Sequence, residues 1–302
     1  MRTLTLLNWN FEDNGGGDQA KWAKGHDLLA SLNPDLLLRQ EPWDAADNGH
    51  TIHNQQEDVL GLRGWIGARS RTAVYADPTL FAPVRDWQDK VAPMWVQPPT
   101  PVLLRYRPAG STAMPFVAVS YHLHYCSVTN RASEAQSLTA YADRKWKTHD
   151  GRKITPPILA GGDNNSYPHQ DLPGAPALPD LSSIKDKRHM VHRSRLLPDG
   201  TRVPDTEPDK TLRDAELFDL ARYWAEKSGD TSAVARTVNA SDTHGPDARI
   251  DRVYGSTHFL PAVIGVDVIE VDPALSDHHV VRVKLDRDVL ADILNEQQEL
   301  DA

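Results

Sequence analysis

The chain has 302 residues, a formal net charge of −9 and one cysteine, Cys126. A single cysteine excludes an intrachain disulfide and a zinc site with several cysteine ligands. The ordinary proportion of hydrophobic residues argues against extensive disorder, and the negative charge argues against a surface covered in basic residues for holding nucleic acid. No apolar run is long enough for a signal peptide or a membrane span, so we expect a reducing, cytoplasmic location and no membrane partner.

Short apolar runs of strand length recur along the chain, and Gly, Pro, Asp or Asn residues bound each of them. In chain order the predicted strands are 4–8, 35–40, 73–76, 102–106, 116–123, 157–160, 249–254, 263–271 and 279–285. Amphipathic patterns predict helices over 19–32, 129–147, 213–227 and 288–300. The two kinds of element alternate irregularly, which predicts an α+β fold with helices packed over sheets.

One segment, 166–211, interrupts this pattern. It is rich in proline, histidine and charged residues and has no sustained hydrophobic period. Segments of this length without secondary structure are usually functional loops or disordered. We therefore expect a single domain over residues 1–302 with a long, loop-rich insertion at about 166–211.

Two stretches are locally basic in this acidic chain. Residues 185–202 hold six lysines and arginines against two aspartates, and a second basic stretch covers 131–153. Charge runs of this kind are either solvated faces or surfaces that bind phosphate groups. On the second interpretation Arg188, Arg193 and Arg195 contact the phosphates of the substrate.

Polar side chains gather at the ends of the predicted strands. They are Asn8 and Asn10, Gln40 and Glu41, Ser120 and His122, Asp163 and Asn165, Asp251, and Asp277 with His278. Carboxylates, amides and imidazoles delivered by strand ends can converge on one cleft. A set rich in oxygen ligands suits Mg²⁺ or Mn²⁺, whereas zinc favours histidine and cysteine.

Six short motifs, in this order, resemble the endonuclease/exonuclease/phosphatase superfamily, which includes deoxyribonuclease I and the exonuclease III type enzymes. The motifs are Trp-Asn at 9–10, Gln-Glu at 40–41, His-Leu at 122–123, Gly-Gly-Asp-Asn-Asn at 161–165, Arg-Ile-Asp at 249–251 and Ser-Asp-His at 276–278. The resemblance implies a four-layer α/β/β/α sandwich, in which two packed, mostly antiparallel sheets are covered by helices. It also implies a hydrolase that cleaves phosphodiester bonds with the help of a divalent metal, on a nucleic acid or nucleotide.

The same resemblance implies a metal site. Asn10 and Glu41 match the metal ligands of the superfamily, and Asp277 matches a further ligand or a contact through water. We expect one Mg²⁺ or Mn²⁺ ion there, which would stabilise the charge that develops during an in-line displacement. A second ion near Asp163 and Asn165 stays open at this stage.

Five residues match catalytic positions of the superfamily. His278 matches the catalytic histidine and Asp251 its carboxylate partner, which would fix the tautomer and favour the imidazolium. Asp163 matches the residue that orients or deprotonates the attacking water. Asn165 matches an amide that holds a phosphate oxygen, and His122 matches a histidine that donates to the scissile phosphate. Which histidine is the acid and which the base stays open.

A nearby histidine competes with His122 for its role. His124 lies two residues further on and would point to the same face of a continuing strand. We favour His122, because the histidine of the superfamily directly precedes a leucine, as His122 precedes Leu123.

Two other functions compete with the nuclease hypothesis. The acidic charge favours a phosphatase or phosphodiesterase that acts on a small molecule or a lipid headgroup, because nonspecific binding to duplex DNA depends on lysine and arginine. A binding protein on an inactive hydrolase fold would lack a ligand or the catalytic histidine, and here every matched position is filled. The substrate, the choice of DNA or RNA, endo- or exo-cleavage, and the oligomeric state are left open.

Overall fold

Two six-stranded sheets pack face to face in the computed structural model, which describes residues 2–148, 151–169 and 173–300. The first sheet has the order β15 (Val263–Ile269), β16 (Val280–Asp286), β1 (Thr3–Asn10), β2 (Leu36–Gln40), β4 (Thr72–Ala76) and β3 (Arg63–Ile66). The second has the order β13 (Leu217–Asp219), β14 (Asp251–Ser256), β10 (Ile158–Asp163), β7 (Phe116–His122), β6 (Thr100–Tyr106) and β5 (Phe81–Asp86). Neighbouring strands are antiparallel except for the pairs β1–β2 and β7–β10.

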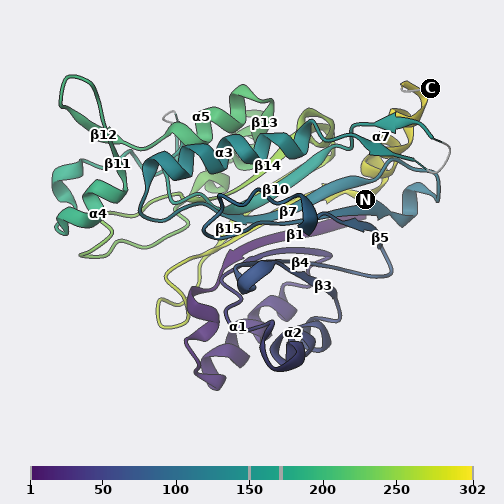
Figure 1. Ribbon diagram of the computed structural model, residues 1–302, viewed down its shortest axis with the longest axis horizontal. Coiled ribbons are helices and arrows are strands. Elements are labelled where there is room, and N and C mark those ends of the chain that lie inside the picture. Colours follow the sequence, from purple (N-terminus) through teal and green to yellow (C-terminus); the bar gives the residue numbers. More distant parts are fainter. Residues whose placement is uncertain (1, 149–150, 170–172, 301–302) are drawn as a thin grey trace.

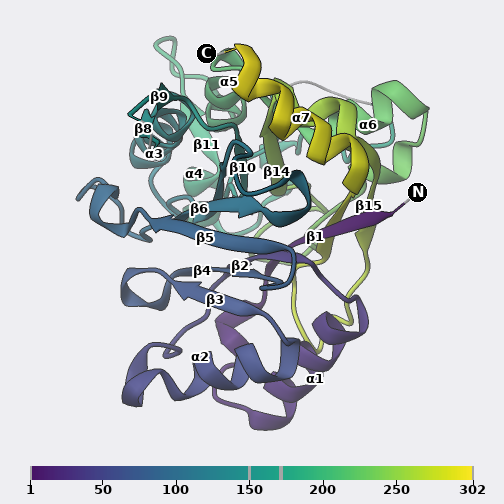
Figure 2. The ribbon, with the colours of Figure 1, turned by 90° about the vertical axis from the view of Figure 1, so that its right-hand side faces the viewer.

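Helices cover the outer faces of both sheets (Figure 1). The helices α1 (Gln19–Ser31) and α2 (Asp47–Leu60) lie on the first sheet, and α3 (Val128–Ala142) and α5 (Glu207–Asp214) lie on the second. Figure 2 shows α6 (Leu220–Ser228) and α7 (Arg287–Leu300) together at one side of the two sheets. This is the predicted four-layer α+β sandwich. None of the helices in the described residues combines the length and the apolar character needed to cross a bilayer.

The core follows from the alternation of side chains along buried strands. On β1, Leu4 and Leu6 point into the core between the two sheets, whereas Leu7 and Trp9 point outward into the layer beneath α1. Successive side chains of a strand face opposite sides of its sheet. Because both faces of these sheets are covered, the sequences of the central strands are nearly continuous apolar runs.

All nine predicted strands fall on strands of the two sheets, whereas the strands β3, β5 and β13 and the helix α2 were not predicted. The predicted helix over 129–147 ends at Ala142. The pattern over 213–227 predicts one helix, but the structure ends α5 at Asp214, forms β13 and then begins α6. Glu216 has a positive φ of 59°, which breaks the helix, and the Asp219 carboxylate caps α6 by accepting from the backbone of Ala221 and Arg222.

The segment 166–211 contains more structure than its composition predicts. It holds α4 (Lys187–His192) and a hairpin of β11 (Ser194–Leu196) and β12 (Arg202–Pro204). The fully buried Arg131 of α3 attaches this segment to the second sheet. Its Nε donates to Asp205 Oδ2 at 2.8 Å, and its Nη2 donates to the carbonyl of His192 at 2.8 Å. Arg131 therefore serves the fold, although it lies in a basic stretch that could have bound phosphate.

Candidate active site

The cleft lies where the core between the sheets changes from apolar to polar. On β7, Phe116 and Ala118 belong to the apolar core, while Ser120 and His122, which face the same way, are polar. The strands β1, β2 and β10 change at the same level, because Asn8, Gln40 and Gly161 follow their last apolar core residues. One end of the sandwich thus becomes a polar cleft of about 380 Å³.

A buried polar layer, formed by Asn8, Gln40 and Ser120, lies between the apolar core and the cleft. Gln40 Nε2 donates to Asn8 Oδ1 at 3.0 Å and to Ser120 Oγ at 2.9 Å, so the two sheets are hydrogen-bonded to each other here. Gly161 leaves the space for this contact, since a Cβ at that position would lie 2.9 Å from Asn8 Oδ1 and 2.7 Å from Leu38 Cδ1. Asn8 Nδ2 and Gln40 Oε1 are buried in this layer without a hydrogen-bond partner among the described residues.

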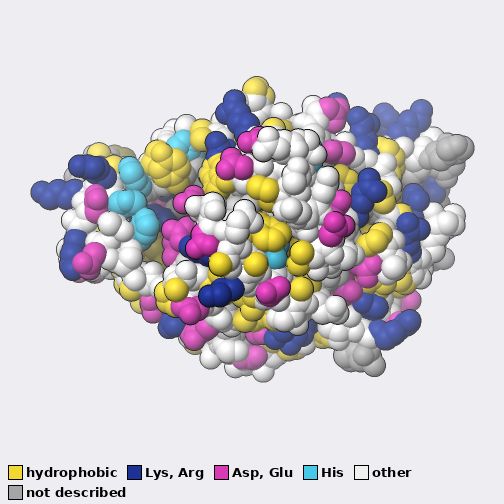
Figure 3. Space-filling model, turned by 90° about the horizontal axis from the view of Figure 1, so that it is seen from below, with side chains coloured by type: hydrophobic (Ala, Val, Ile, Leu, Met, Phe, Trp, Pro, Cys, Tyr) yellow, Lys and Arg dark blue, Asp and Glu magenta, His cyan; other side chains and the backbone are white. Residues whose placement is uncertain are grey.

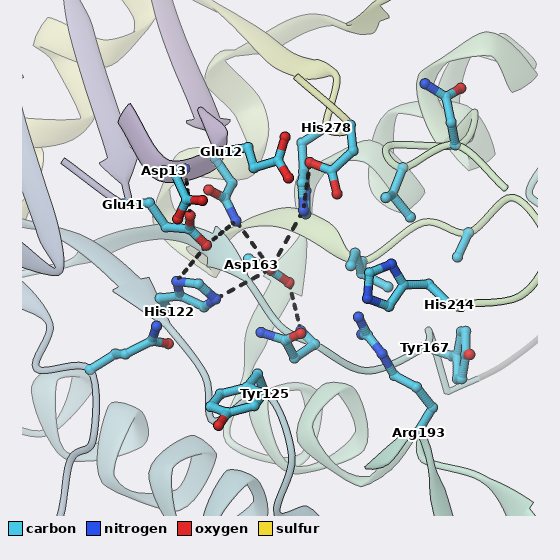
Figure 4. A pocket seen from close by; sticks show the side chains of 18 of the residues that line it. Glu12, Asp13, Glu41, His122, Tyr125, Asp163, Tyr167, Arg193, His244 and His278 are labelled. Carbon is cyan, nitrogen blue, oxygen red and sulfur yellow. Dashed lines mark hydrogen bonds and ion pairs between the residues drawn. The ribbon is translucent and has the colours of Figure 1, made fainter. Parts of the chain in front are cut away.

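Glu41 enters the cleft from a turn directly after β2. It has a positive φ of 57°, and its carboxylate is held by the backbone N–H of Asp13 at 2.9 Å and by Trp43 Nε1 at 3.2 Å. The amide of Asn10 lies between two carboxylates, with Nδ2 3.3 Å from both Glu41 Oε1 and Asp163 Oδ2 (Figure 4). The ends of β1, β2 and β10 therefore meet at one point.

His278 forms a buried pair with Asp251. Its Nδ1 lies 2.8 Å from Asp251 Oδ2, and the backbone N–H of Asp251 is held by Thr237 Oγ1 at 2.9 Å. The other ring nitrogen, Nε2, faces the cleft at 3.9 Å from Asp163 Oδ2 and 3.8 Å from Asp277 Oδ1. The pair therefore presents one imidazole nitrogen to whatever the cleft contains.

The structure places His122, and not His124, in the cleft. Nε2 of His122 lies 3.4 Å from Asp163 Oδ2, and its Nδ1 lies 3.8 Å from Glu41 Oε1. Nδ1 of His124 accepts the backbone N–H groups of Cys126 and Ser127 instead, at 3.2 and 3.1 Å. The preference for His122 in the sequence agrees with this geometry.

Asn165 is fixed close to the centre of the site. Its backbone N–H donates to Asp163 Oδ1 at 2.7 Å, and its Nδ2 donates to the carbonyl of Leu123 at 3.0 Å. It lines the cleft and has a positive φ of 48°. The strained turn brings the amide of Asn165 beside the carboxylate of Asp163.

Opposite charges decide the protonation states in the cleft. Burial disfavours a charged His278, but the carboxylate of Asp251 and those of its neighbours outweigh burial and raise the pKa of His278 well above its ordinary value. The pKa of His122 is raised in the same way, because Asp163 overcomes the effect of burial. Burial acts in the opposite direction on the carboxylates, but His122 more than offsets it and lowers the pKa of both Asp163 and Glu41. The cleft therefore holds carboxylates opposite two histidines whose pKa values are raised.

The donor set at the end of β1 and β2 fits a divalent cation. Oδ1 of Asn10 is buried, and no group in the described part of the chain donates a hydrogen bond to it. Nδ2 of the same amide contacts the carboxylates of Glu41 and Asp163. Carboxylate and amide oxygens are the ligands that Mg²⁺ prefers. A second group, Asp163 with Asp251 and His278, also brings its ligand atoms within 4.8 Å of one another. In this second group Nδ1 of His278 is already bonded to Asp251, and Nε2 is the ring nitrogen that faces the cleft.

The three arginines expected at the substrate lie in different places. Arg193 lines the cleft, and its guanidinium points into it (Figure 4). Its Nη1 is buried and has no hydrogen-bond acceptor among the described residues. Arg195 is paired instead with Glu207 at 2.9 Å, and Arg188 is exposed and does not line the cleft. The geometry therefore supports Arg193 as a substrate contact more than its two neighbours.

Several residues that line the cleft were not among the sequence candidates. They are Glu12, Asp13, Trp43, Gln97, Tyr125, Tyr167, Asn239 and His244. Glu12 and Asp13 could have been noticed, because they directly follow the strand that ends in Asn10. Tyr125 and His244 lie in loops, and no pattern in the sequence indicates where a loop docks.

Comparison with solved structures identifies the fold. No protein-family model and no curated protein matches the sequence. An endonuclease/exonuclease/phosphatase family protein from Bacteroides thetaiotaomicron superposes with a TM-score of 0.58 at 16% identity, covering 94% of this chain and 95% of that one. The protein therefore has the fold of the endonuclease/exonuclease/phosphatase family, as its motifs predicted.

Two similar structures are described as phosphatases. The mannosyl-6-phosphatase of Bacteroides thetaiotaomicron VPI-5482 has a TM-score of 0.58 and 16% identity, covering 93% of this chain and 98% of that one. A 3′ phosphatase from Neisseria, NExo, was solved with a product DNA hairpin; its TM-score is 0.58 at 15% identity, with 94% of this chain and 99% of that one covered. The shared fold thus carries phosphoester chemistry in those proteins.

Proposed function

We propose that this protein is a divalent-metal-dependent hydrolase of phosphoester bonds, and that its substrate is a phosphodiester of a nucleic acid or nucleotide. The observation that carries the proposal is the convergence of Asn10, Glu41, Asp163 and the His278–Asp251 pair on one cleft. Proteins of the same fold include phosphatases that act on a sugar phosphate and on DNA, which supports a phosphoester substrate. Mg²⁺ or Mn²⁺ is the cation that the oxygen ligands favour.

The residues of the chain provide a mechanism for attack by water. Asp163, a carboxylate at neutral pH, can orient a water molecule and accept its proton as the bond to phosphorus forms. The bond between phosphorus and the leaving oxygen breaks in the same displacement, and that oxygen takes a proton from a histidine of the cleft or from water. His278 presents Nε2 to the cleft as an imidazolium, which donates a hydrogen bond to a phosphate oxygen and stabilises its growing charge. His122 lies on the opposite side of Asp163, and the raised pKa of its imidazole favours a second positive charge there.

Asp251 acts through His278 and not on the substrate. Because it is fully buried and bonded to Nδ1, it fixes the ring orientation and stabilises the imidazolium. Asn10 and Glu41 would hold the cation, which when bound adds charge stabilisation at the phosphoryl oxygens. Asp277 at the rim would contribute a further ligand or a contact through water. A second ion near Asp163 and Asn165 stays a possibility of the same site.

A small-molecule or headgroup phosphate is the second candidate substrate. The rim of the cleft carries Glu12, Asp13 and Asp277, and this negative charge opposes the approach of a long polyanion. The volume of the cleft also suits a compact ligand. An inactive binding protein is less well supported, because the metal ligands and the histidine pair are all present. The cytoplasmic location expected from the sequence stays a prediction.

A hydrolysis panel tests the proposal. The purified protein is incubated with Mg²⁺, Mn²⁺ or EDTA and with supercoiled plasmid, single strands, bis-(p-nitrophenyl) phosphate, and phosphorylated sugars or inositols. We expect metal-dependent cleavage of diesters, which EDTA abolishes. Release of phosphate only from monoesters would replace the nuclease hypothesis with a phosphatase, and no hydrolysis with any metal would favour the binding protein.

A further inference from the structure

The two sides of the cleft have different chemistry (Figure 4). Glu12, Asp13 and Glu41 lie on one side, whereas Tyr125, Tyr167, Arg193 and His244 lie on the other. We call these last four residues the aromatic wall. The proposed mechanism uses the acidic side, His122 and the pair of His278 with Asp251. It gives the aromatic wall no role apart from that of Arg193 as a substrate contact.

The aromatic wall is assembled from three segments: Tyr125 lies in the loop after β7, Tyr167 and Arg193 lie in 166–211, and His244 lies in the 241–245 hairpin. The last two segments pack against each other. Within 166–211, α4 carries His189, whose ring meets the ring of His244 edge-on with the centroids 4.4 Å apart. His244 lies on a tight hairpin closed by Gly245, which has a φ of 95° and packs against Ile184 so closely that a Cβ would lie 2.8 Å away. These contacts hold the His244 side of the wall in place. Figure 3 shows histidine side chains gathered at the end of the molecule that carries α4.

Tyr125 is the most open aromatic ring of the wall. The ring of Tyr125 is held in place, because it stacks on His124 with the planes 19° apart and meets the ring of His192 edge-on. Even so, 55% of Tyr125 stays exposed, although large apolar side chains are usually covered. An exposed aromatic ring that is held in place at the edge of a cleft is a stacking surface for a planar ligand.

The imidazole of His244 in the wall, and that of His192 behind Tyr125, favour the neutral form. Burial, together with the nearby His189 and Arg193, lowers the pKa of both rings. Arg193 is the only lysine or arginine among the described residues that line the cleft. The wall thus offers planar rings and one guanidinium, which matches a nucleotide: a base and a phosphate.

We propose that the aromatic wall is a base-binding subsite, in which Tyr125 stacks on a nucleobase while Arg193 holds its phosphate. This inference rests on the proposed phosphoesterase function and narrows its substrate to a nucleotide, free or at the end of a single strand. An intact duplex hides the faces of its bases inside the stack and is held through many phosphate contacts. The wall offers one such contact, and the rim opposite it is acidic.

Binding is tested without metal, so that hydrolysis does not interfere. The probes are 2-aminopurine riboside monophosphate, a short single strand that ends in 2-aminopurine, and a blunt duplex with the same terminal base, each followed by 2-aminopurine fluorescence. We expect quenching with the single strand or the mononucleotide, and at least tenfold weaker binding of the duplex. Comparison of the first two probes tells a free nucleotide from a strand end.

Three variants assign the subsite. Tyr125→Ala should weaken binding of the preferred probe about tenfold or more, in line with the loss of one stacked base. Tyr125→Phe keeps the ring and should stay within about twofold of the wild type. Tyr223→Ala removes a tyrosine of α6 that does not line the cleft, and should have no effect on binding. Equal loss in the alanine and phenylalanine variants, or duplex binding as tight as that of the single strand, would overturn the proposal.

A pair of substrates separates this proposal from the phosphoesterase function. Thymidine 5′-(p-nitrophenyl) phosphate and methyl p-nitrophenyl phosphate share a leaving group and differ in the nucleoside. We expect the wild type to prefer the nucleoside ester about tenfold in kcat/KM, and Tyr125→Ala to reduce that ratio toward one. Hydrolysis of both esters without a preference would refute the subsite and leave the phosphoesterase intact. No hydrolysis of either ester with Mg²⁺ would refute the phosphoesterase, while the fluorescence arm still decides whether a base binds.

Discussion

Nδ1 of His278 lies 2.8 Å from Oδ2 of Asp251, and both side chains are buried. The contact leaves only Nε2 facing the cleft. Asp251→Asn keeps the shape but removes the charge that stabilises the imidazolium and fixes its tautomer. We expect kcat for a phosphodiester to fall by about 10²- to 10⁴-fold, with a smaller change in KM.

A matched substitution controls for the loss of a carboxylate. Asp267→Asn removes a partly exposed carboxylate that pairs with Arg282, away from the cleft, and should leave kcat within about twofold. If Asp251→Asn turned over as fast as this control, Asp251 would have no part in catalysis.

Arg193 should matter more to substrate binding than the two other arginines of the same basic stretch. Its Nη1 is buried without an acceptor, whereas Arg195 is paired with Glu207 and Arg188 is exposed. Because a hydrogen bond to a charged group contributes about 1.5–3 kcal/mol, Arg193→Ala should lower kcat/KM about tenfold or more, mainly through KM. Steady-state kinetics of Arg188→Ala gives the comparison, with an expected change below about twofold. A larger loss of kcat/KM in Arg188→Ala would mean that the substrate binds on the outer face of α4.

Glu134 makes the stability of the protein depend on pH. It is buried beneath the cleft and accepts the backbone N–H of His124 at 2.6 Å, and burial raises its pKa to about 7 from 4.5. The folded state therefore binds this proton more tightly than the unfolded state. The Glu134 contribution to the free energy of unfolding should decrease as the pH rises from 4.5 to 7, by about 3 kcal/mol at most.

Urea unfolding at pH 5 and pH 8 measures this effect. Glu134→Gln cannot lose a proton, so its stability relative to the wild type should improve as the pH rises. The exposed Glu226→Gln should give the same difference from the wild type at both pH values. A constant difference between Glu134→Gln and the wild type would show that Glu134 titrates normally.

Arg131 should be needed for the stability of the 166–211 segment. It is fully buried and pairs with Asp205, so Arg131→Met leaves a buried carboxylate without its partner. We expect a loss of about 3–5 kcal/mol in the free energy of unfolding by urea. Arg85→Met breaks an exposed pair with Asp89, which water screens, and should lower the free energy of unfolding far less. Similar losses in the two variants would mean that the Arg131–Asp205 pair does not hold the segment in place.

The fold and the centre of the site could be predicted because both follow from strands. A buried strand shows its length and its ends in the sequence, and the residues at those ends, such as Asn10 and Asp163, are fixed by the register of the sheet. The aromatic wall could not be predicted. His244 reaches the cleft because its hairpin docks on the 166–211 segment, through tertiary contacts such as Gly245 against Ile184. Tyr125 lies in the loop after β7, and its ring is placed by its contact with His192.

The predicted helix boundaries over 213–227 were wrong for a related reason. Amphipathic spacing over 213–227 continues through β13, but one residue of positive φ, Glu216, and one capping carboxylate, Asp219, divide the segment. These are local backbone events, and the hydrophobic period does not register them. This error does not change the predicted sandwich, because β13 lies at the edge of its sheet.

The most direct test of the account is the turnover of methyl p-nitrophenyl phosphate by the wild type and by Glu41→Gln, with Mg²⁺ and with EDTA. We predict that Mg²⁺ supports hydrolysis, that EDTA abolishes it and excess Mg²⁺ restores it, and that Glu41→Gln loses at least about 100-fold in kcat/KM while its circular dichroism spectrum is unchanged. Turnover that is insensitive to EDTA, or full activity of Glu41→Gln, would contradict a metal-dependent phosphoesterase centred on Asn10 and Glu41.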